Sequence, residues 1–547
     1  MIARTCLAFL LAAMGSSLTA FADAPNSPLV DAPAGKLQGE AVGDVHIFRG
    51  IPFAQPPVGA LRWKPPLPAA RWKGTRDATR FGPACLQPKP RAASIYSWDL
   101  PSMSEDCLTL NVWAPAQAKK APVFVWIHGG ALSGGSGSEP LYDGTKFAER
   151  GVVVVTVNYR LGVLGFFAHP ALSAESRRNI SGNYGLLDQI AALKWVKANI
   201  HSFGGDPANV TIAGESAGGL SVMYLMATRE AHGLFSKAVM QSTYMITAPE
   251  LRTATHGGFS SEAVGVWLAE KLGAGALVAL RSMDAGAMVE AAAPTGYFPF
   301  FTIDGRVLPR QVVDVFDRGE QAKVPMLVGF NSGEIRSLRV LAPPVPADAA
   351  TYTAQIREKY ADLADAFLRL YPPDNLEESV LAATRDGLYG WTAERLVRKH
   401  TAAGAPAFLY FFDHGYPAAN ELRLHAFHAA EIPYMFGNAH KTPIRWPKLP
   451  DTAADKQLSD AMVAYWTSFA GAGVPSAAGQ PKWPAYGAAR EYMAFEDSPL
   501  PKKQLLPGMY ELNEQVVCRR RAKGGIPWNW NFGLAAPPMP PAEASCN

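Results

Sequence analysis

Short runs of apolar, often β-branched residues recur along the chain, and longer stretches with helical spacing separate them. Each run has the length and composition of a buried strand. The runs cover residues 123–127, 152–157, 210–213, 238–241, 326–330 and 407–412. Between two of them, residues 187–198 predict a helix with Trp195 on its inner face. This alternation predicts an α/β fold in which helices cover both faces of one mostly parallel sheet.

The run at 210–213 leads into the most informative motif of the chain. Residues 214–218 read Gly-Glu-Ser-Ala-Gly, a G-x-S-x-G, and the apolar residues that follow can continue as a helix. In a strand–turn–helix context, this motif exposes a serine hydroxyl on a strained turn that tolerates only small neighbours. The N–H group of Ala217 would then face an oxyanion formed at Ser216. An ordinary serine–glycine turn is the alternative, which the flanking strand and helix disfavour.

A second glycine-rich segment follows the strand predicted at 123–127. It reads His128-Gly129-Gly130-Ala131 and continues to Gly135. Acyl transfer requires backbone N–H groups directed at the tetrahedral oxygen, and glycine lets the backbone approach a ligand closely. A strand that ends in His-Gly-Gly, upstream of a nucleophilic serine, is the expected source of such donors. A flexible loop without a role is the weaker alternative.

These segments resemble the type-B carboxylesterases, a branch of the α/β-hydrolase fold that includes cholinesterases, bacterial para-nitrobenzyl esterases and some fungal lipases. Residues 203–218 match the serine signature of that family throughout, and residues 104–113 resemble its second signature. Other matching blocks lie at 48–54, 158–166 and 182–189, and recognisable pieces run from about residue 35 to about residue 512. The resemblance implies an α/β-hydrolase fold, hydrolysis of carboxylic esters, and a Ser-Glu-His triad in that chain order.

The resemblance also assigns the other two members of the triad. Glu334 takes the acid position because it closes a G-x-N-x-x-E block after the strand at 326–330, where a carboxylate can hold an imidazole in one tautomer. His428 stands three residues before the glutamate of an E-I-P-Y block and takes the position of the general base. The competing His425 is assigned to the surroundings of the triad or the pocket. No further cluster of ligands accompanies this His-x-x-His pair, so we expect no metal and no other cofactor.

Two positions depart from the family pattern. Ala131 replaces the third glycine of the oxyanion segment; its N–H group remains, while its methyl group restricts φ and takes up room near the acyl group. The resemblance thus assigns the oxyanion donors to Gly130, Ala131 and Ala217. Thr243 stands where relatives often have glycine, directly after Ser242, whose counterpart hydrogen-bonds the Glu-His pair.

An aromatic cluster lies where relatives shape the acyl pocket. It comprises Tyr297, Phe298, Phe300 and Phe301. These rings would favour short or flat acyl groups, unless they belong to the core instead. Tyr96 and Trp98 are candidates for lining the active-site gorge, and in cholinesterases a tryptophan of this loop binds a quaternary ammonium group. Trp98 is offset by one residue from that position, so we do not expect a cholinesterase.

Two segments, 248–301 and 339–399, are longer than ordinary loops and are expected to form helical insertions that roof the active site. The tail from about residue 523 is rich in proline and alanine and is expected to wrap the surface as coil. The arginines at 519–521 fit a solvated face better than a binding patch. No internal repeat is present, so residues 23–547 are expected to form a single domain.

The composition suits a large core and an exported protein. The chain has 547 residues, of which 48% are hydrophobic. Arg4, a short apolar run and an A-x-A sequence ending at Ala22 predict a signal peptide over residues 1–22, and hence a secreted or periplasmic protein. No apolar run is long enough for a membrane span. Loss of Arg4 lowers the formal net charge from +4 to +3, which argues neither for nucleic acid nor for a charged membrane surface. The expected partner is a small-molecule ester, and no oligomeric state is predicted.

The cysteines support an oxidising compartment. Four of the five lie outside residues 1–22, and an even number suits disulfide formation. The family closes a loop before its second signature, which implies a bond between Cys85 and Cys107. Cys518 and Cys546 would then form a second pair, on spacing and parity, with two free thiols as the alternative.

Three functions remain open. The motifs favour a secreted carboxylic ester hydrolase that acts on short-chain or aromatic esters through an acyl-enzyme. A lipase for long-chain esters would use the Cys85–Cys107 loop as an amphipathic lid, which the charged residues and prolines of this loop suit poorly. A non-catalytic binding member of the family would lack part of the triad, whereas Ser216, Glu334 and His428 are all present.

Overall fold

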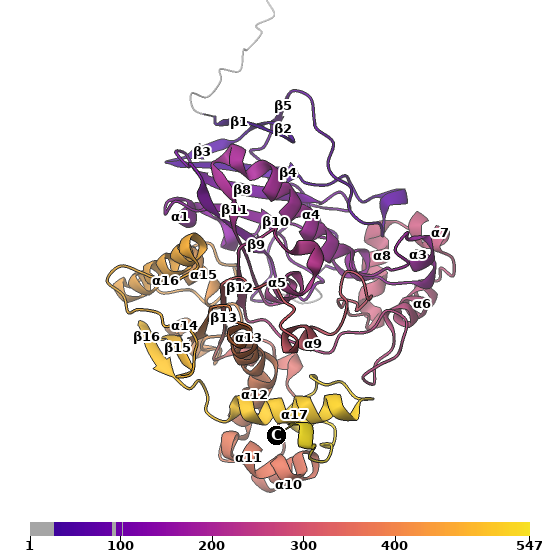
Figure 1. Ribbon diagram of the computed structural model, residues 1–547, viewed down its shortest axis with the longest axis vertical. Coiled ribbons are helices and arrows are strands. Elements are labelled where there is room, and N and C mark those ends of the chain that lie inside the picture. The colour runs from indigo at the N-terminus through magenta and orange to yellow at the C-terminus, as the bar shows by residue number, and fades with distance from the viewer. Residues whose placement is uncertain (1–26, 90–93, 101, 547) are drawn as a thin grey trace, which may run out of the picture.

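A large sheet organises the protein (Figure 1). The computed structural model describes residues 27–89, 94–100 and 102–546, so the predicted signal peptide lies outside the described residues. Within them the main sheet has 11 strands. Their order across the sheet is β16 (Pro499–Lys503), β15 (Glu491–Phe495), β14 (Ala407–Phe412), β13 (Met326–Asn331), β12 (Lys237–Gln241), β11 (Gly205–Glu215), β9 (Ala121–Ile127), β10 (Val153–Val157), β8 (Thr109–Pro115), β4 (Val45–Pro52) and β3 (Glu40–Val42).

The strands from β10 to β15 run parallel, and antiparallel strands flank them on both sides. Each of the apolar runs predicted as strands is a strand of this parallel part. Two small sheets lie apart from it: β1 (Leu29–Ala32), β2 (Gly35–Gln38) and β5 (Thr75–Asp77) form one, and β6 (Ala84–Cys85) and β7 (Met103–Ser104) form the other.

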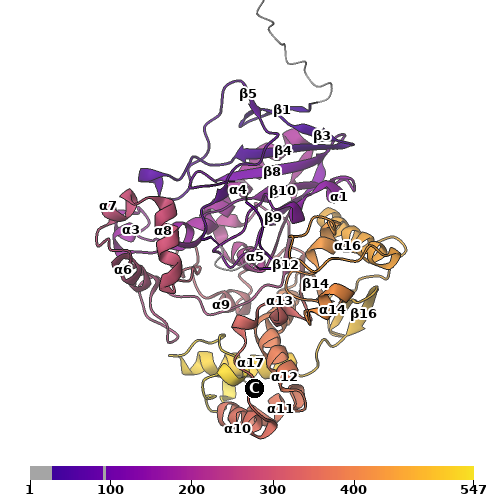
Figure 2. The ribbon, with the colours of Figure 1, turned by 180° about the vertical axis from the view of Figure 1, so that it is seen from behind.

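Side chains of the central strands alternate between two hydrophobic cores. In β9, Val123, Val125 and Ile127 enter one core, whereas Phe124 and Trp126 enter the other. The first core is covered by α4 (Tyr184–Asn199), α5 (Ala217–Ala227), α9 (Val312–Asp317) and α13 (Trp391–Ala402). The second is covered by α1 (Thr145–Ala148), α15 (Ile432–Phe436) and α16 (Ala453–Ala472) (Figure 2). The predicted α/β architecture, with helices on both faces of the sheet, is therefore confirmed.

The first insertion forms three helices beside the sheet. These are α6 (Ser261–Lys271), α7 (Leu277–Ser282) and α8 (Ala285–Ala292). They share an apolar cluster with α2 (Gly162–Phe166) and α3 (Pro170–Glu175). The chain then returns toward the sheet through residues 297–301, which carry the aromatic cluster of the sequence.

The second insertion divides into two parts. Its α10 (Ala349–Tyr360) and α11 (Ala364–Leu370) pack with α17 (Met509–Lys523) in an apolar cluster of their own, at the end of the molecule opposite β1 (Figure 1). Its α12 (Leu376–Arg385), the π-helical turn Asp386–Gly390 and α13 return to the sheet. This later part approaches the candidate site, where Tyr389 lies 5.6 Å from the ring of His428, whereas α10 and α11 belong to the separate cluster.

The C-terminal tail follows α17 and has little regular structure beyond two short turns, at Gly533–Ala535 and Ala544–Cys546. The expectation that the arginines at 519–521 form a solvated face is wrong. Arg520 is fully buried and donates to the carbonyl oxygens of Trp530 and Asn531 at 2.9 and 3.2 Å. Arg519 forms a two-pronged ion pair with Asp362. Arg520 therefore holds the tail against α17, whereas Arg519 joins α17 to the second insertion.

Both predicted cysteine pairs are at bonding distance in the structure. Cys85 is joined to Cys107, and Cys518 is joined to Cys546. The first bond closes the loop that carries Tyr96 and Trp98, and the second holds the end of the tail to α17. Each therefore restrains a segment that has little regular structure of its own.

Candidate active site

Ser216 lies at a sharp turn between β11 and α5. Its φ of 56° and ψ of −123° are strained for a residue with a side chain. The turn needs glycine on both sides: a Cβ atom at Gly218 would lie 2.0 Å from the carbonyl oxygen of Ile127, and one at Gly214 would lie 2.4 Å from Gly218. Strand, turn and helix thus form as the motif predicts, and they place the hydroxyl of Ser216 at the carboxyl edge of the parallel sheet.

The glycine-rich segment after β9 folds beside Ser216. A Cβ atom at Gly129 would lie 3.2 Å from the Cβ of Ser216. The loop is closed by the N–H groups of Ser133 and Gly134, which donate to the carbonyl of Gly130. Ala131 has a φ of 54°, a left-handed conformation that costs a residue with a side chain about 1 kcal/mol or more.

The proposed oxyanion donors are the N–H groups of Gly130, Ala131 and Ala217. Among the hydrogen bonds that the described residues form in loops, turns and caps, none uses these groups as donors. Ala217 is also the first residue of α5, where an N–H group has no partner within the helix. These donors are therefore free to bind a developing negative charge.

Glu334 and His428 form a buried pair beyond the ends of β13 and β14. One carboxylate oxygen of Glu334 accepts a hydrogen bond from Nδ1 of His428. The other oxygen accepts from the hydroxyl of Ser242 at 2.6 Å and from the N–H group of Asn331 at 2.8 Å. Every oxygen of this fully buried carboxylate thus has a donor, which fixes the orientation of the imidazole ring. The expected bond from Ser242 to the pair is present.

Glu215 is a second carboxylate beside the imidazole. Its Oε1 lies 3.0 Å from Nε2 of His428, although the two atoms do not form a hydrogen bond of good geometry. Burial raises the pKa of Glu215 well above its usual range, against the influence of His428. Burial alone would lower the pKa of His428, but the charges of Glu215 and Glu334 outweigh it and raise that pKa to about 9.

Ser216 and His428 are not joined in this structure. Among the hydrogen bonds formed by the described residues, none runs between the hydroxyl of Ser216 and Nε2 of His428, which faces Glu215 instead. Hydrogen bonds of this kind are often long or misaligned in unliganded enzymes and shorten when substrate binds. The Ser216 turn, or nucleophile elbow (residues 214–218), and the Glu334–His428 pair therefore meet at one edge of the sheet through Glu215, but no hydrogen bond joins Ser216 to His428.

Glu431 is a third buried carboxylate in this region, and the sequence did not assign it a role. It accepts hydrogen bonds from the side-chain amides of Gln241 and Asn331, at 2.8 and 2.6 Å, and burial raises its pKa. Glu215 was also not assigned. Both glutamates lie within the quoted motifs, directly before Ser216 and three residues after His428. A carboxylate is costly to bury, so a glutamate within a motif that folds into the interior must have partners there. The positions of these two glutamates in the motifs are therefore the signal from which the sequence could have identified them.

His425 lies away from the Glu334–His428 pair. Its side chain is 39% exposed, and Nε2 pairs with Asp413 at 2.9 Å while Nδ1 contacts Asn420 at 3.2 Å. The prediction that it supports the triad or the pocket is therefore wrong. Thr243 is buried, and its Cβ lies 3.2 Å from the position that a Cβ at Gly219 would take, so it packs closely against the start of α5.

Tyr96 connects the disulfide loop to the candidate base. Its hydroxyl donates to the carbonyl oxygen of His428 at 2.9 Å and is hydrogen-bonded to the hydroxyl of Ser337 at 2.7 Å. The ring of Tyr389, from the π-helical turn, lies 5.6 Å from the imidazole. These aromatic side chains restrict the access of water to the imidazole.

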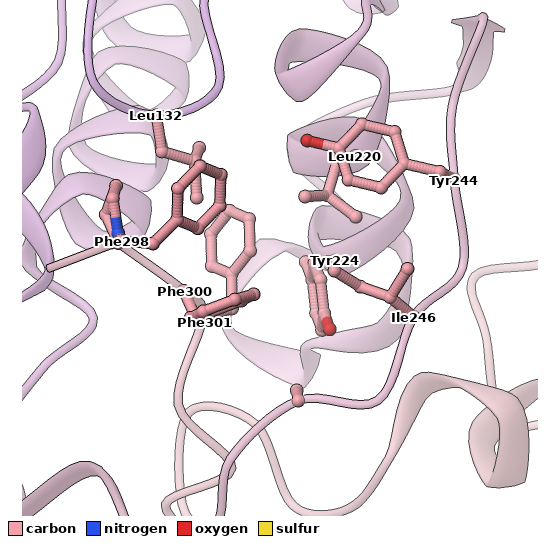
Figure 3. A pocket seen from close by; sticks show the side chains of 10 residues that line it. Leu132, Leu220, Tyr224, Tyr244, Ile246, Phe298, Phe300 and Phe301 are labelled. Atoms are coloured by element: carbon pink, nitrogen blue, oxygen red, sulfur yellow. The ribbon is translucent and has the colours of Figure 1, made fainter. Parts of the chain in front are cut away.

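An apolar cavity lies beside α5, and Leu220, four residues after Ser216, is one of the residues that line it (Figure 3). Its free volume of about 10 Å³ is about enough for one water molecule. Leu220 and Tyr224 of α5 form one side with Tyr244 and Ile246, and the phenylalanines of the first insertion form the other (Figure 3). Leu132, directly after the proposed oxyanion donors, also lines the cavity. The lining residues are Leu132, Leu220, Tyr224, Tyr244, Ile246, Ala248, Phe298, Pro299, Phe300 and Phe301.

Three of the five predicted pocket residues line this cavity: Phe298, Phe300 and Phe301. Tyr297 does not, because its ring packs into the apolar cluster of the first insertion. Trp98 does not line it either, since it is partly buried against the second core. Tyr96 is the residue of this loop that contacts the candidate base.

The described residues hold neither a cluster of metal ligands nor a membrane-spanning helix. They contain no group of three or more histidine, cysteine, aspartate or glutamate side chains arranged to hold a metal ion. None of their helices is both long and apolar enough to cross a membrane.

Comparisons with known proteins give one consistent result. A model of the carboxylesterase family matches residues 26–510. The chain is 40% identical to fumonisin B1 esterase from Sphingopyxis macrogoltabida over 84% of its length and 85% of that protein. It is 38% identical to para-nitrobenzyl esterase from Bacillus subtilis over 84% of its length and 92% of that protein. A solved structure of a PNB esterase superposes with a TM-score of 0.78 and 34% identity, over 89% of this chain and 99% of the other.

Proposed function

Because this chain belongs to the carboxylesterase family and is a carboxylic ester hydrolase with the α/β-hydrolase fold, we propose that it cleaves esters through an acyl-enzyme on Ser216. In this proposal Glu334 and His428 complete a Ser-Glu-His triad. The substrates are small esters with short or aromatic acyl groups, and the protein works outside the cytoplasm.

The first chemical step is attack by the serine. His428 takes the proton from the hydroxyl of Ser216 through Nε2, and the oxygen bonds to the ester carbonyl carbon. Glu334 holds the Nδ1 proton and stabilises the imidazolium that forms. The N–H groups of Gly130, Ala131 and Ala217 bind the oxyanion.

The second half of the reaction returns the enzyme to its starting state. The imidazolium gives its proton to the alcohol oxygen as the carbon–oxygen bond breaks, which leaves an acyl group on Ser216. Water then attacks this acyl group while His428 accepts a proton from it. The bond to Ser216 breaks, the serine oxygen takes that proton back from His428, and the acid is released.

The observation that carries the proposal is the buried Glu334–His428 pair beside the strained Ser216 turn. Strain of this kind persists only where the surrounding structure enforces it, and it is concentrated at functional sites. The pair is surrounded by aromatic rings and held by further hydrogen bonds, so the imidazole is already oriented before a substrate binds.

The size of the cavity supports the acyl preference. Its small free volume and the three phenylalanines leave little room for a long chain beyond Ser216. Each methylene group that cannot be buried forfeits about 0.8 kcal/mol. The relatives are named for different esters, fumonisin B1 and para-nitrobenzyl, so their names support the reaction class and not one substrate.

Export is supported by two independent features. The sequence of residues 1–22 has the arrangement of a signal peptide. The four remaining cysteines form two disulfides, which persist in oxidising compartments.

A series of p-nitrophenyl esters from acetate to palmitate tests the proposal. We expect kcat/KM to be highest for the shortest acyl chains and to fall over a few carbons. A maximum at long chains, on emulsified substrate, would favour the lipase alternative.

A further inference from the structure

One wall of the cavity is a short segment that follows β12. Tyr244, Ile246 and Ala248 line the cavity, and Figure 3 shows Tyr244 and Ile246 facing it from the side opposite the phenylalanines. The residues between them, Met245 and Thr247, do not line it. This wall segment, residues 244–248, has no regular secondary structure, so its position depends on what holds its outer side.

The outer side of the wall segment is held by the C-terminal tail and by α13, where the hydroxyl oxygen of Thr392 accepts a hydrogen bond from the N–H group of Met245 at 2.9 Å. The hydroxyl oxygen of Thr247 accepts hydrogen bonds from the N–H groups of Trp528 and Asn529, at 2.9 and 3.3 Å. The side-chain amide of Asn529 donates to the carbonyl oxygen of Met245. Trp528 and Asn529 are both almost fully buried. These contacts join residues more than 280 positions apart in the chain.

Gln311 holds the far end of the wall segment. Its side-chain oxygen accepts from the N–H group of Ala248 at 3.0 Å, and its amide donates to the carbonyl oxygen of Ala248 at 2.7 Å. Gln311 also lines a second, larger cavity of about 380 Å³, which is bounded by Trp528 and by residues of α9 and α17. Gln311 therefore contacts the wall of the narrow apolar cavity at Ala248 and also lines the larger cavity.

The tail itself is fixed at both ends. The Cys518–Cys546 bond ties its end to α17, and buried Arg520 binds the carbonyl of Trp530. The match to the family model ends at residue 510. The contacts that Trp528 and Asn529 make with the wall segment thus come from a part of the chain beyond the matched region, whereas Gln311 lies within it.

We propose that the C-terminal tail determines acyl-chain length by holding the wall segment in place. Thr247, Asn529 and Gln311 are positioning residues in this scheme, since they act on the wall and do not touch the substrate. When their hydrogen bonds are lost, the wall can shift toward the larger cavity, and the narrow cavity lengthens. This inference rests on the proposed function, because it takes the narrow cavity as the acyl site.

The test compares two substitutions of one residue. Thr247→Val removes the hydroxyl acceptor with almost no change of shape, whereas Thr247→Ser keeps the acceptor. For each variant, kcat and KM are measured with p-nitrophenyl acetate and p-nitrophenyl octanoate. We expect Thr247→Val to raise the octanoate-to-acetate ratio of kcat/KM about fourfold or more, the value of one additional buried methylene group, through a lower KM for octanoate. Thr247→Ser should keep the parental ratio.

Two further changes protect the test against a variant that fails to fold. Asn529→Ala removes the donor to Met245, and the double change Cys518→Ala with Cys546→Ala frees the end of the tail; both should raise the same ratio. If the ratio stays at the parental value in all folded variants, or if activity on both esters falls in parallel, the inference is wrong. If the parent hydrolyses neither ester, the proposed function fails instead.

Discussion

Replacement of Glu215 by glutamine should move the acid limb of the pH–activity profile to lower pH. In the parent, His428 must lose its proton before it can act as a base, and its pKa is raised to about 9 by the carboxylates beside it. Glu215→Gln removes one of those charges and keeps the size of the side chain. The neutral imidazole is then formed at a lower pH, so a larger share of maximal activity is reached at pH 7.

The size of the shift follows from the structure. Two unit charges 3.0 Å apart interact by about 5 kcal/mol at an effective dielectric constant of about 20. One pH unit corresponds to about 1.4 kcal/mol. Burial favours the protonated form of Glu215, so only part of that interaction is present. We therefore expect a displacement of at least about one pH unit.

The assay is kcat/KM for p-nitrophenyl acetate between pH 5 and pH 10, with each variant scaled to its own plateau. Glu394→Gln is a matched control, because Glu394 is also buried but pairs with Arg398 and does not influence His428. An acid limb that stays in place in Glu215→Gln, or moves to higher pH, would refute the explanation of the His428 pKa.

Further expectations concern the base, an ion pair and the strained loop. His428→Ala should lower kcat by several orders of magnitude, whereas His425→Ala should keep substantial activity; the reverse result in the same esterase assay would show that the base is misassigned. Arg395 outweighs burial and lowers the pKa of Asp317 to about 2, so Asp317→Asn should cost about 2 kcal/mol at pH 7. The lowered pKa of Asp317 stabilises the folded state fully above the unfolded pKa of 3.8, and this stabilisation is lost as the pH falls through about 2. The free energies of unfolding of parent and variant, measured by urea titration, should therefore converge in acid. Ala131→Gly should relieve the left-handed strain and retain activity. A large loss of kcat would show that the methyl group of Ala131 is needed for catalysis and would contradict this expectation.

Most strands of the parallel part of the sheet were predictable from sequence because they are buried on both faces. Such strands are continuous apolar runs, as in 123–127 and 407–412. The outer strands were missed: β4 and β15 carry polar residues such as Arg49 and Glu491, since one face or one edge of them is less protected. Their assignment depends on neighbours that a local pattern does not contain.

The candidate site shows a similar division. Ser216, Glu334 and His428 could be named because each lies in a local motif with a fixed place relative to a strand. Their contacts depend on distant parts of the chain: the position of Nε2 beside Glu215 results from how the His428 loop packs on the elbow. The mistaken assignment of His425 arose because two histidines three residues apart differ only in which neighbours they meet.

The C-terminal tail shows most clearly what a local sequence pattern does not predict. Proline and alanine without periodicity predict coil, and the tail is indeed mostly irregular. Nothing local shows that Trp528 is fully buried or that Arg520 binds backbone carbonyls. Burial of an irregular segment is decided by the surface on which it packs, here the wall segment behind the cavity.

The most direct test of the central claim is to treat the parent and Ser216→Ala with a fluorophosphonate and to measure the intact mass together with p-nitrophenyl acetate hydrolysis. We expect one adduct on the parent, located at Ser216, with loss of all esterase activity. The variant should have a native circular dichroism spectrum, no adduct and a turnover reduced by several orders of magnitude. A folded Ser216→Ala protein that still hydrolyses the ester near the parental rate, or an adduct at another residue, would contradict the assignment.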